Sequence, residues 1–317
     1  MTSLVGNDTA RSAIAGAEVG GNLHHAWLIA GPEGLGKAAH AREAAAALLS
    51  RAANDVHGRT AAMIAAGAHP DFRLLERLPV DESKPEKGVA RSIKIDQVRA
   101  LGPMFAVKPS MSTRRVIVID AIDDLERPAS NALLKSLEEP PSGTIFLLVT
   151  HAPGRLLPTI RSRCRLLRFD PLGDDEVAAV VRAKLPNASA AEIAVLVRAG
   201  AGSPGRALRF AGLDLAAIEA ALMAIAADGD RGNQQRVRLS KALSPKAAQA
   251  RYEAFLERVP AFIAERARTM AGVPLRDALD AYAAAADLAR VSLAQSHDAG
   301  TTAFEMGSFV ARLGPRR

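Results

Sequence analysis

Residues 25–38, HAWLIAGPEGLGKA, decide the fold. The short apolar run over residues 25–30 predicts a buried strand, and residues 38–50 are strong helix formers. The glycine-rich loop Gly31–Lys37 between them fits G-x-x-x-x-G-K, the pattern of a phosphate-binding loop whose backbone N–H groups converge on phosphate oxygens. A glycine-rich turn without a ligand is the alternative. Four residues are predicted to contact nucleotide phosphates: Gly31, Gly34, Gly36 and Lys37.

Two groups that ATP hydrolysis needs are absent. The position after Lys37 normally carries a hydroxyl that binds Mg²⁺, and here it is Ala38. The strand RVIVID ends in Asp120, which could hold Mg²⁺ through water, but the residue after it is Ala121 instead of a water-polarising Glu. We predict that the chain does not turn over ATP, since positioning and electrostatics supply nearly all of this catalysis. The two aspartates 123–124 are predicted to cap the next helix.

The remaining pattern predicts an α/β domain followed by helices. Further strands are expected at residues 72–75, 115–120, 144–150 and 161–169, and helices at 95–105 and 130–139. Alternating strands and helices predict a parallel, doubly wound sheet. After residue 171 only helix signals remain, with breaks expected at residues 228–232, 244–245 and 272–274. The predicted domains are therefore an α/β domain (1–169), a small helical lid (170–211) and an all-helical C-terminal domain (212–317).

Composition narrows the class of protein. The chain has 317 residues and a net charge of +7, an excess that fits nucleic acid or an acidic partner without deciding between them. Its single cysteine, Cys164, excludes an internal disulfide and a four-cysteine zinc site, so no metal is predicted. The sequence shows no signal peptide and no apolar stretch of membrane-spanning length, so we expect a cytoplasmic protein.

Two further residues and one basic stretch could act on a nucleotide. Thr150 ends a predicted strand and could sense a γ-phosphate, or it is an ordinary strand-end threonine. Arg206 begins a predicted helix and could close onto phosphate, or it lies at an ordinary surface helix start. Five arginines fall within fourteen residues, and they form either a solvated face or the source of an arginine finger for a neighbour's nucleotide site. These arginines are Arg155, Arg161, Arg163, Arg165 and Arg168.

Residues 130–141 (SNALLKSLEEPP), 144–150 (TIFLLVT) and 155–164 (RLLPTIRSRC) closely resemble bacterial clamp-loader AAA+ subunits. The triplet Ser162-Arg163-Cys164 is that family's signature, and the resemblance extends over about residues 5–211. It implies an AAA+ core with a parallel sheet, a helical lid and a helical oligomerisation collar. The altered phosphate loop resembles the non-hydrolysing branch of the family rather than the gamma/tau motors.

The resemblance also implies partners and roles. Such a subunit sits in a five-membered arc with delta and three gamma/tau copies, and the arc loads a ring-shaped sliding clamp at primed DNA. Arg163 would serve in trans as an arginine finger in a neighbouring ATP site. The loop glycines, Lys37, Thr150 and Arg206 match nucleotide-contact positions, and Asp120 matches the Walker B acid.

The sequence departs from the family at one place. Many members carry a four-cysteine zinc module before a His-Pro-Asp segment, but residues 51–68, which precede His69-Pro70-Asp71, contain no cysteine. No cofactor is required, although retention of Lys37 leaves passive ATP or ADP binding open. The alternatives are an active gamma/tau-like ATPase, a basic DNA-binding scaffold, and a structural subunit in which Arg163 has no role.

Overall fold

The computed structural model describes residues 4–55, 57–81, 83–84, 88–295 and 297–315. The chain divides into two compact units, Met1–Glu176 and Val177–Arg317, which are described separately. The outermost residues of the predicted terminal domains, 1–3 and 316–317, lie outside the described residues. Among the residues described, no helix has the length and apolar character needed to cross a bilayer.

The first unit is built on a parallel five-stranded sheet in the order β2-β3-β4-β1-β5. The central strands form because β-branched and apolar residues alternate between two buried faces. Trp27 in β1 lies opposite Leu147 of β4 and Arg165 of β5. The strands are β1 (Ala26–Ala30), β2 (Phe72–Glu76), β3 (Arg115–Asp120), β4 (Thr144–Thr150) and β5 (Arg165–Arg168).

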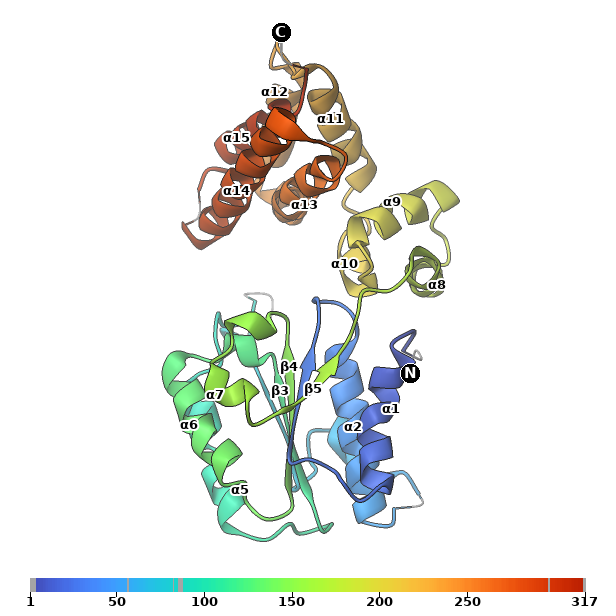
Figure 1. Cartoon of the computed structure of the whole chain (residues 1–317), viewed down its shortest axis with the longest axis vertical. Coiled ribbons are helices and arrows are strands. Elements are labelled where there is room, and N and C mark those ends of the chain that lie inside the picture. The colour runs from blue at the N-terminus through green and yellow to red at the C-terminus, as the bar shows by residue number, and fades with distance from the viewer. Residues whose placement is uncertain (1–3, 56, 82, 85–87, 296, 316–317) are drawn as a thin grey trace. The chain divides into compact units, whose positions relative to one another are not determined.

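Helices cover both faces of the sheet (Figure 1). One face carries α1 (Asp8–Val19), α2 (Lys37–Ala52) and α3 (Arg59–Ala65). The other carries α4 (Ile95–Arg99), α5 (Gly102–Ala106), α6 (Arg127–Glu138) and α7 (Pro158–Arg161), with short 3₁₀ turns at Ile122–Asp124 and Pro153–Arg155. Ile29 of β1 packs toward α2, whereas Leu28 packs toward α6, as the two-residue period of a strand requires. The predicted parallel, doubly wound α/β domain is confirmed.

The outer edge of β2 is covered by side chains. Arg73 donates from Nη1 to the carbonyl oxygen of Phe72 at 2.8 Å, and Gln97 donates from Nε2 to that of Glu76 at 2.9 Å. Both carbonyls lie on β2, the strand at one end of the sheet. Two of the hydrogen-bond acceptors that a further strand would use at this edge are therefore already engaged by side chains.

The second unit is helical throughout its described residues. Helix α13 packs against α14, and α12 packs against α15. The predicted boundary between lid and collar, at residues 211 and 212, falls between α10 and α11 inside this unit and stays a prediction. The helices are α8 (Asp174–Lys184, whose first turn belongs to the first unit), α9 (Ala190–Gly200), α10 (Pro204–Arg209), α11 (Leu215–Asp228), α12 (Gln234–Leu243), α13 (Gln249–Ala267), α14 (Gly272–Gln295) and α15 (Ala299–Ala311).

Three predicted elements differ from the structure. The helix expected over residues 95–105 is two short helices, α4 and α5, separated just before Gly102-Pro103, where glycine and proline disfavour a continuous helix. The strand expected over residues 161–169 is only β5, because the chain before it turns through α7. The break expected at residues 272–274 is the start of α14, since a proline is tolerated in the first helical turn.

Candidate functional site

The phosphate loop has the backbone that its glycines permit. It connects β1 to α2, and φ is +80° at Gly34 and +79° at Gly36, the residue that precedes α2. Gly31 has φ +154°, and a Cβ there would lie only 2.2 Å from the carbonyl oxygen of Phe169. Only glycine avoids that overlap, so the close approach of the loop to the end of β5 depends on Gly31. The strand-loop-helix context predicted for this segment is present.

Lys37 is buried, with 2% of its surface exposed, and its Nζ donates to the carbonyl oxygen of Pro32 at 2.5 Å. Burial lowers the pKa of Lys37 to about 8, although the negative charges of Asp120, Glu33 and Asp123 oppose this shift. The ammonium group is thus satisfied by the loop's own backbone. The side chain of Leu4 lies so close to Gly36 that a Cβ added to this glycine would be 2.6 Å from Leu4 Cδ2.

The residues around this loop do not fit a magnesium nucleotide poised for hydrolysis. Ala38 offers no hydroxyl to a metal, and Ala121 is a buried methyl group where a water-polarising carboxylate is needed. Asp120 ends β3 and contributes a favourable charge to Lys37. Within the described part of the chain, no three His, Cys, Asp or Glu side chains form a group that could hold a metal ion. No step of ATP hydrolysis is assigned to this chain.

Thr150 ends β4 and is fully buried. Its hydroxyl donates to Asp123 Oδ1 at 2.9 Å. The same carboxylate accepts hydrogen bonds from the backbone N–H of His151 at 2.7 Å and of Ala152 at 3.3 Å. The hydroxyl that could sense a γ-phosphate is therefore bound to a carboxylate of the chain itself.

The prediction that Asp123 and Asp124 cap the next helix is wrong. Helix α6 begins at Arg127, and the residue before it, Glu126, makes no side-chain cap hydrogen bond. Asp124 instead pairs with Arg77 at 3.1 Å, and its partial burial raises its pKa despite that arginine. Both aspartates sit too early in the chain, in the 3₁₀ turn after β3, to reach the first amides of α6.

Arg163 follows α7 and lies at the surface of the first unit. Its Nη2 pairs with Glu138 Oε1 at 2.8 Å, and its Nη1 donates to the carbonyl oxygen of Thr159 at 2.9 Å. One third of the side chain remains exposed. Next to it, burial raises the pKa of the Cys164 thiol to about 12, so this cysteine is a packing residue rather than a nucleophile.

The other arginines of the basic stretch do not share one role. The guanidinium of Arg165 lies 5.1 Å from the centroid of the Trp27 ring, where it makes a cation–π contact. Arg155 lines a cavity beside α7, while Arg161 and Arg168 are exposed. The five arginines are close together in sequence, but their side chains have different environments in the structure.

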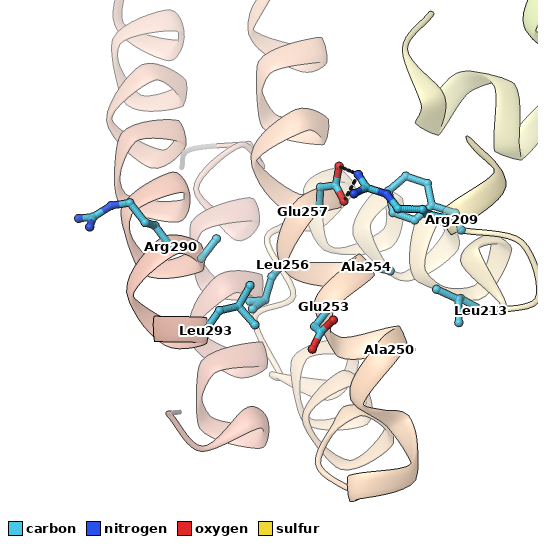
Figure 2. Close-up of a pocket in the computed structure, with 11 residues that line it drawn as sticks. Arg209, Leu213, Ala250, Glu253, Ala254, Leu256, Glu257, Arg290 and Leu293 are labelled. Carbon is cyan, nitrogen blue, oxygen red and sulfur yellow. Dashed lines mark hydrogen bonds and ion pairs between the residues drawn. The ribbon is translucent and has the colours of Figure 1, made fainter. Parts of the chain in front are cut away.

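Arg206 lies in the second unit, whereas the other predicted site residues lie in the first. Ser203 caps α10, and Arg206 Nε pairs with Glu257 Oε1 of α13 at 2.7 Å. Arg209 contacts both oxygens of the same carboxylate at 3.2 and 3.3 Å, as Figure 2 shows. Arg209 and Glu257 line a cavity of 530 Å³ between the end of α10, α13 and α14, together with apolar side chains such as Leu256. The arginine predicted to close onto phosphate, Arg206, thus pairs with a carboxylate of the chain itself.

A known protein family matches the part of the chain that contains the phosphate loop and Arg163. The family described as DNA polymerase III, delta subunit, matches residues 8–173, more than half of the chain. The chain belongs to this family. The resemblance to clamp-loader subunits predicted from the sequence is confirmed.

The individual proteins to which this chain is similar include delta' subunits and tau/gamma subunits of DNA polymerase III. The DNA polymerase III subunit delta' of Pseudomonas aeruginosa is 38% identical over 203 residues, 62% of this chain and 59% of the relative. That of Escherichia coli is 34% identical over 192 residues, 59% of this chain and 54% of the relative. The tau/gamma subunit of Haemophilus influenzae is 33% identical over 178 residues, 56% of this chain and 25% of the relative. The matches span just over half the length of these two delta' relatives.

Solved structures are similar at a lower level. A gamma-subunit-related protein of Thermotoga maritima is 17% identical with a TM-score of 0.40, covering 96% of this chain and 98% of that chain. The Holliday junction branch migration motor RuvB of the same organism is 17% identical with a TM-score of 0.43, covering 93% of this chain and 82% of that chain.

Sequence reasoning missed the acidic partners of three predicted site residues, Thr150, Arg163 and Arg206. Asp123 lies three residues after the predicted Walker B acid, and its position before a predicted helix led to its interpretation as a helix cap. Glu138 ends the helix of the SNALLKSLEEPP motif, which marked the family without showing where its carboxylate points. Glu257 is 51 positions from Arg206, and no local pattern connects them.

Proposed function

We propose that this chain is a delta'-type subunit of a DNA polymerase III clamp loader. It does not hydrolyse ATP itself, and it supplies Arg163 to the ATP site of a neighbouring gamma/tau-type subunit. The complex loads the sliding clamp on primed DNA in chromosomal replication. The proposal is carried by one contrast. Ala38 stands at the position of the metal-binding hydroxyl and Ala121, after β3, at that of the catalytic carboxylate, whereas the arginine of the family triplet has its guanidinium at the surface.

The chemistry of Arg163 supports this role. A planar, permanently charged fork suits the equatorial oxygens of a phosphoryl group better than a lysine ammonium does. Glu138 and the Thr159 carbonyl fix the guanidinium near the surface but leave part of it exposed. Arginine fingers elsewhere are worth about 10³–10⁵ in turnover, so one such group would affect a neighbour's ATP site strongly.

The proposal names partners and a place of action. They are delta and gamma/tau subunits, with the sliding clamp and primed DNA reached through the complex in the bacterial cytosol. Helices α11–α15 would form the collar that joins the subunits. No cofactor is required for this role, and passive binding of ATP or ADP at Lys37 is a separate property to be measured.

Two assays test the proposal. The isolated chain should show no ATP turnover above background, and appreciable turnover would favour the gamma/tau-like alternative. In a loader reconstituted with delta and gamma/tau, Arg163→Ala should lower DNA-stimulated ATP turnover about tenfold or more, and clamp loading with it. Arg161→Ala is the matched control, since that exposed arginine ends α7 and should leave turnover unchanged. Full activity of Arg163→Ala would leave only a structural role.

A DNA-binding scaffold is the second candidate, favoured by the exposure of Arg161 and Arg168 near the β5 edge of the sheet. It predicts strong DNA binding by the isolated chain that weakens steeply with salt. The clamp-loader proposal predicts weak binding unless the partner subunits are present. A titration of primed DNA at two salt concentrations separates them.

A further inference from the structure

Asp123 is the centre of a hydrogen-bond cluster that the proposed function does not use. Both of its carboxylate oxygens accept hydrogen bonds, from the Thr150 hydroxyl and from the N–H groups of His151 and Ala152. The Ala152 N–H also lies 3.2 Å from the Thr150 hydroxyl oxygen. These contacts fasten the first residues after β4 to the 3₁₀ turn after β3. Bonds to an ionised acceptor are stronger than neutral ones.

The fastened residues begin the segment that ends at Arg163. Residues 151–157 lead directly into α7, and Arg163 follows two residues after that helix. At the far end, Ile160 is buried in the core against α6, and Glu138 of α6 holds the guanidinium. The segment is therefore held by Asp123 at its start, by the packing of Leu156 in its middle and by α6 at its end.

Between its two ends the segment is only partly packed. Leu156 contacts the core on the α6 side of the sheet. A pocket of 280 Å³ lies among the 3₁₀ turn after β3, the start of α6 and the segment, lined in part by Leu125, Ser130 and Leu156. The Asp123 bonds are side-chain hydrogen bonds that fix the first residues of the segment, His151 and Ala152.

The Thr150 hydroxyl has one hydrogen to donate. It can donate to Asp123 or to a phosphate oxygen, but not fully to both. Because Asp123 is part of the chain, its oxygen is present whether or not a nucleotide is bound. The Thr150 hydroxyl thus has a hydrogen-bond partner within the chain itself.

We propose that Asp123 is a positioning residue that holds the segment carrying Arg163 in one arrangement without a nucleotide. The inference rests on the proposed function, because it explains how a subunit that does not use ATP keeps its arginine ready for a neighbour. Asp123 acts through residues 151–163 and touches no reacting atom.

Hydrogen exchange on the full-length chain tests the first part of the proposal. Asp123→Asn should speed exchange of the amides in residues 151–163 about tenfold or more, since it removes a charge-assisted acceptor. Thr150→Val removes the hydroxyl at nearly constant volume and should act in the same direction, which keeps the test open if Asp123→Asn folds poorly. Asp124→Asn is the matched control and should leave these amides unchanged, because Asp124 pairs with Arg77 instead. Unchanged exchange in both test variants would overturn the proposal.

ATP turnover in the reconstituted loader tests the second part. Asp123→Asn should lower kcat about tenfold and leave the KM for ATP unchanged, because a misplaced arginine affects the reaction more than binding. Combined with Arg163→Ala, it should cause no further loss, since both changes remove the same interaction. Additive losses would show that Asp123 acts elsewhere and overturn the proposal. If Arg163→Ala alone changes nothing, the proposed function fails, while the exchange result still decides whether Asp123 holds the segment.

Discussion

The phosphate loop and the α7 segment each hold a cation, in opposite ways. Lys37 is 2% exposed and donates to a carbonyl of its own loop, whereas Arg163 is one-third exposed and pairs with a carboxylate on a neighbouring helix. The loop has the backbone of a phosphate loop, although neither Ala38 next to Lys37 nor Ala121 after β3 offers a polar side chain, while the α7 segment presents an arginine at the surface. The comparison teaches that the backbone shape of a motif and the side chains of its chemistry are separate features.

The largest effect is expected from the shape of the loop. Gly31→Ala should destabilise the first unit by about 3 kcal/mol or more, because the new Cβ meets the Phe169 carbonyl and φ is +154°. Urea unfolding followed by Trp27 fluorescence measures this, since the only tryptophan of the chain is buried in β1. Gly154→Ala, in the α7 segment with no atom within 4 Å of a new Cβ, should change stability by less than about 0.5 kcal/mol. Equal effects would remove the contrast between the two regions.

A smaller effect is expected from the charge of Lys37. Its folded pKa of about 8 lies below the ordinary value of 10.5, so between these values the unfolded chain binds more protons than the folded chain. Stability should therefore rise with pH from about 8 to 10.5, and the penalty should be fully present below pH 8. Relative to Lys37→Met, the wild type should gain up to about 3 kcal/mol across this range. Urea unfolding at each pH measures this. If the free energies of unfolding of the two proteins changed with pH by the same amount, burial would not destabilise the ammonium.

The smallest effect is expected from the arginine at the surface. Glu138→Gln should change the free energy of unfolding by less than about 1 kcal/mol, because exposed ion pairs are screened by water. Glu139→Gln, the next residue, is the control and should behave in the same way. A loss above about 2 kcal/mol in Glu138→Gln alone would mean that Arg163 is held as part of the folding core and is not available to a partner.

The sheet and the loop could be predicted because their signals are local. RVIVID and TIFLLVT are β-branched, apolar runs bounded by turn residues, and they became β3 and β4 with the predicted ends. Gly31 and Gly36 marked the loop because positive φ angles need glycine. The division of residues 95–105 into two helices was missed, although Gly102-Pro103 carried its signal.

The partners of the site residues could not be predicted in the same way. Thr150 meets Asp123 across adjacent strand ends, and Arg206 meets Glu257 between two helices that are far apart in sequence. Such contacts depend on tertiary packing, and an aspartate after a strand has several local uses that compete. The charge type was visible in the sequence, but the pairing was not.

The covered edge of β2 has a consequence for assembly. Arg73 and Gln97 occupy carbonyls that an incoming strand would have to use. A strand that added to this edge would have to displace or share these two side-chain hydrogen bonds. Contacts through side chains and helix surfaces avoid that cost, and they allow neighbours to shift against each other without breaking a continuous backbone ladder.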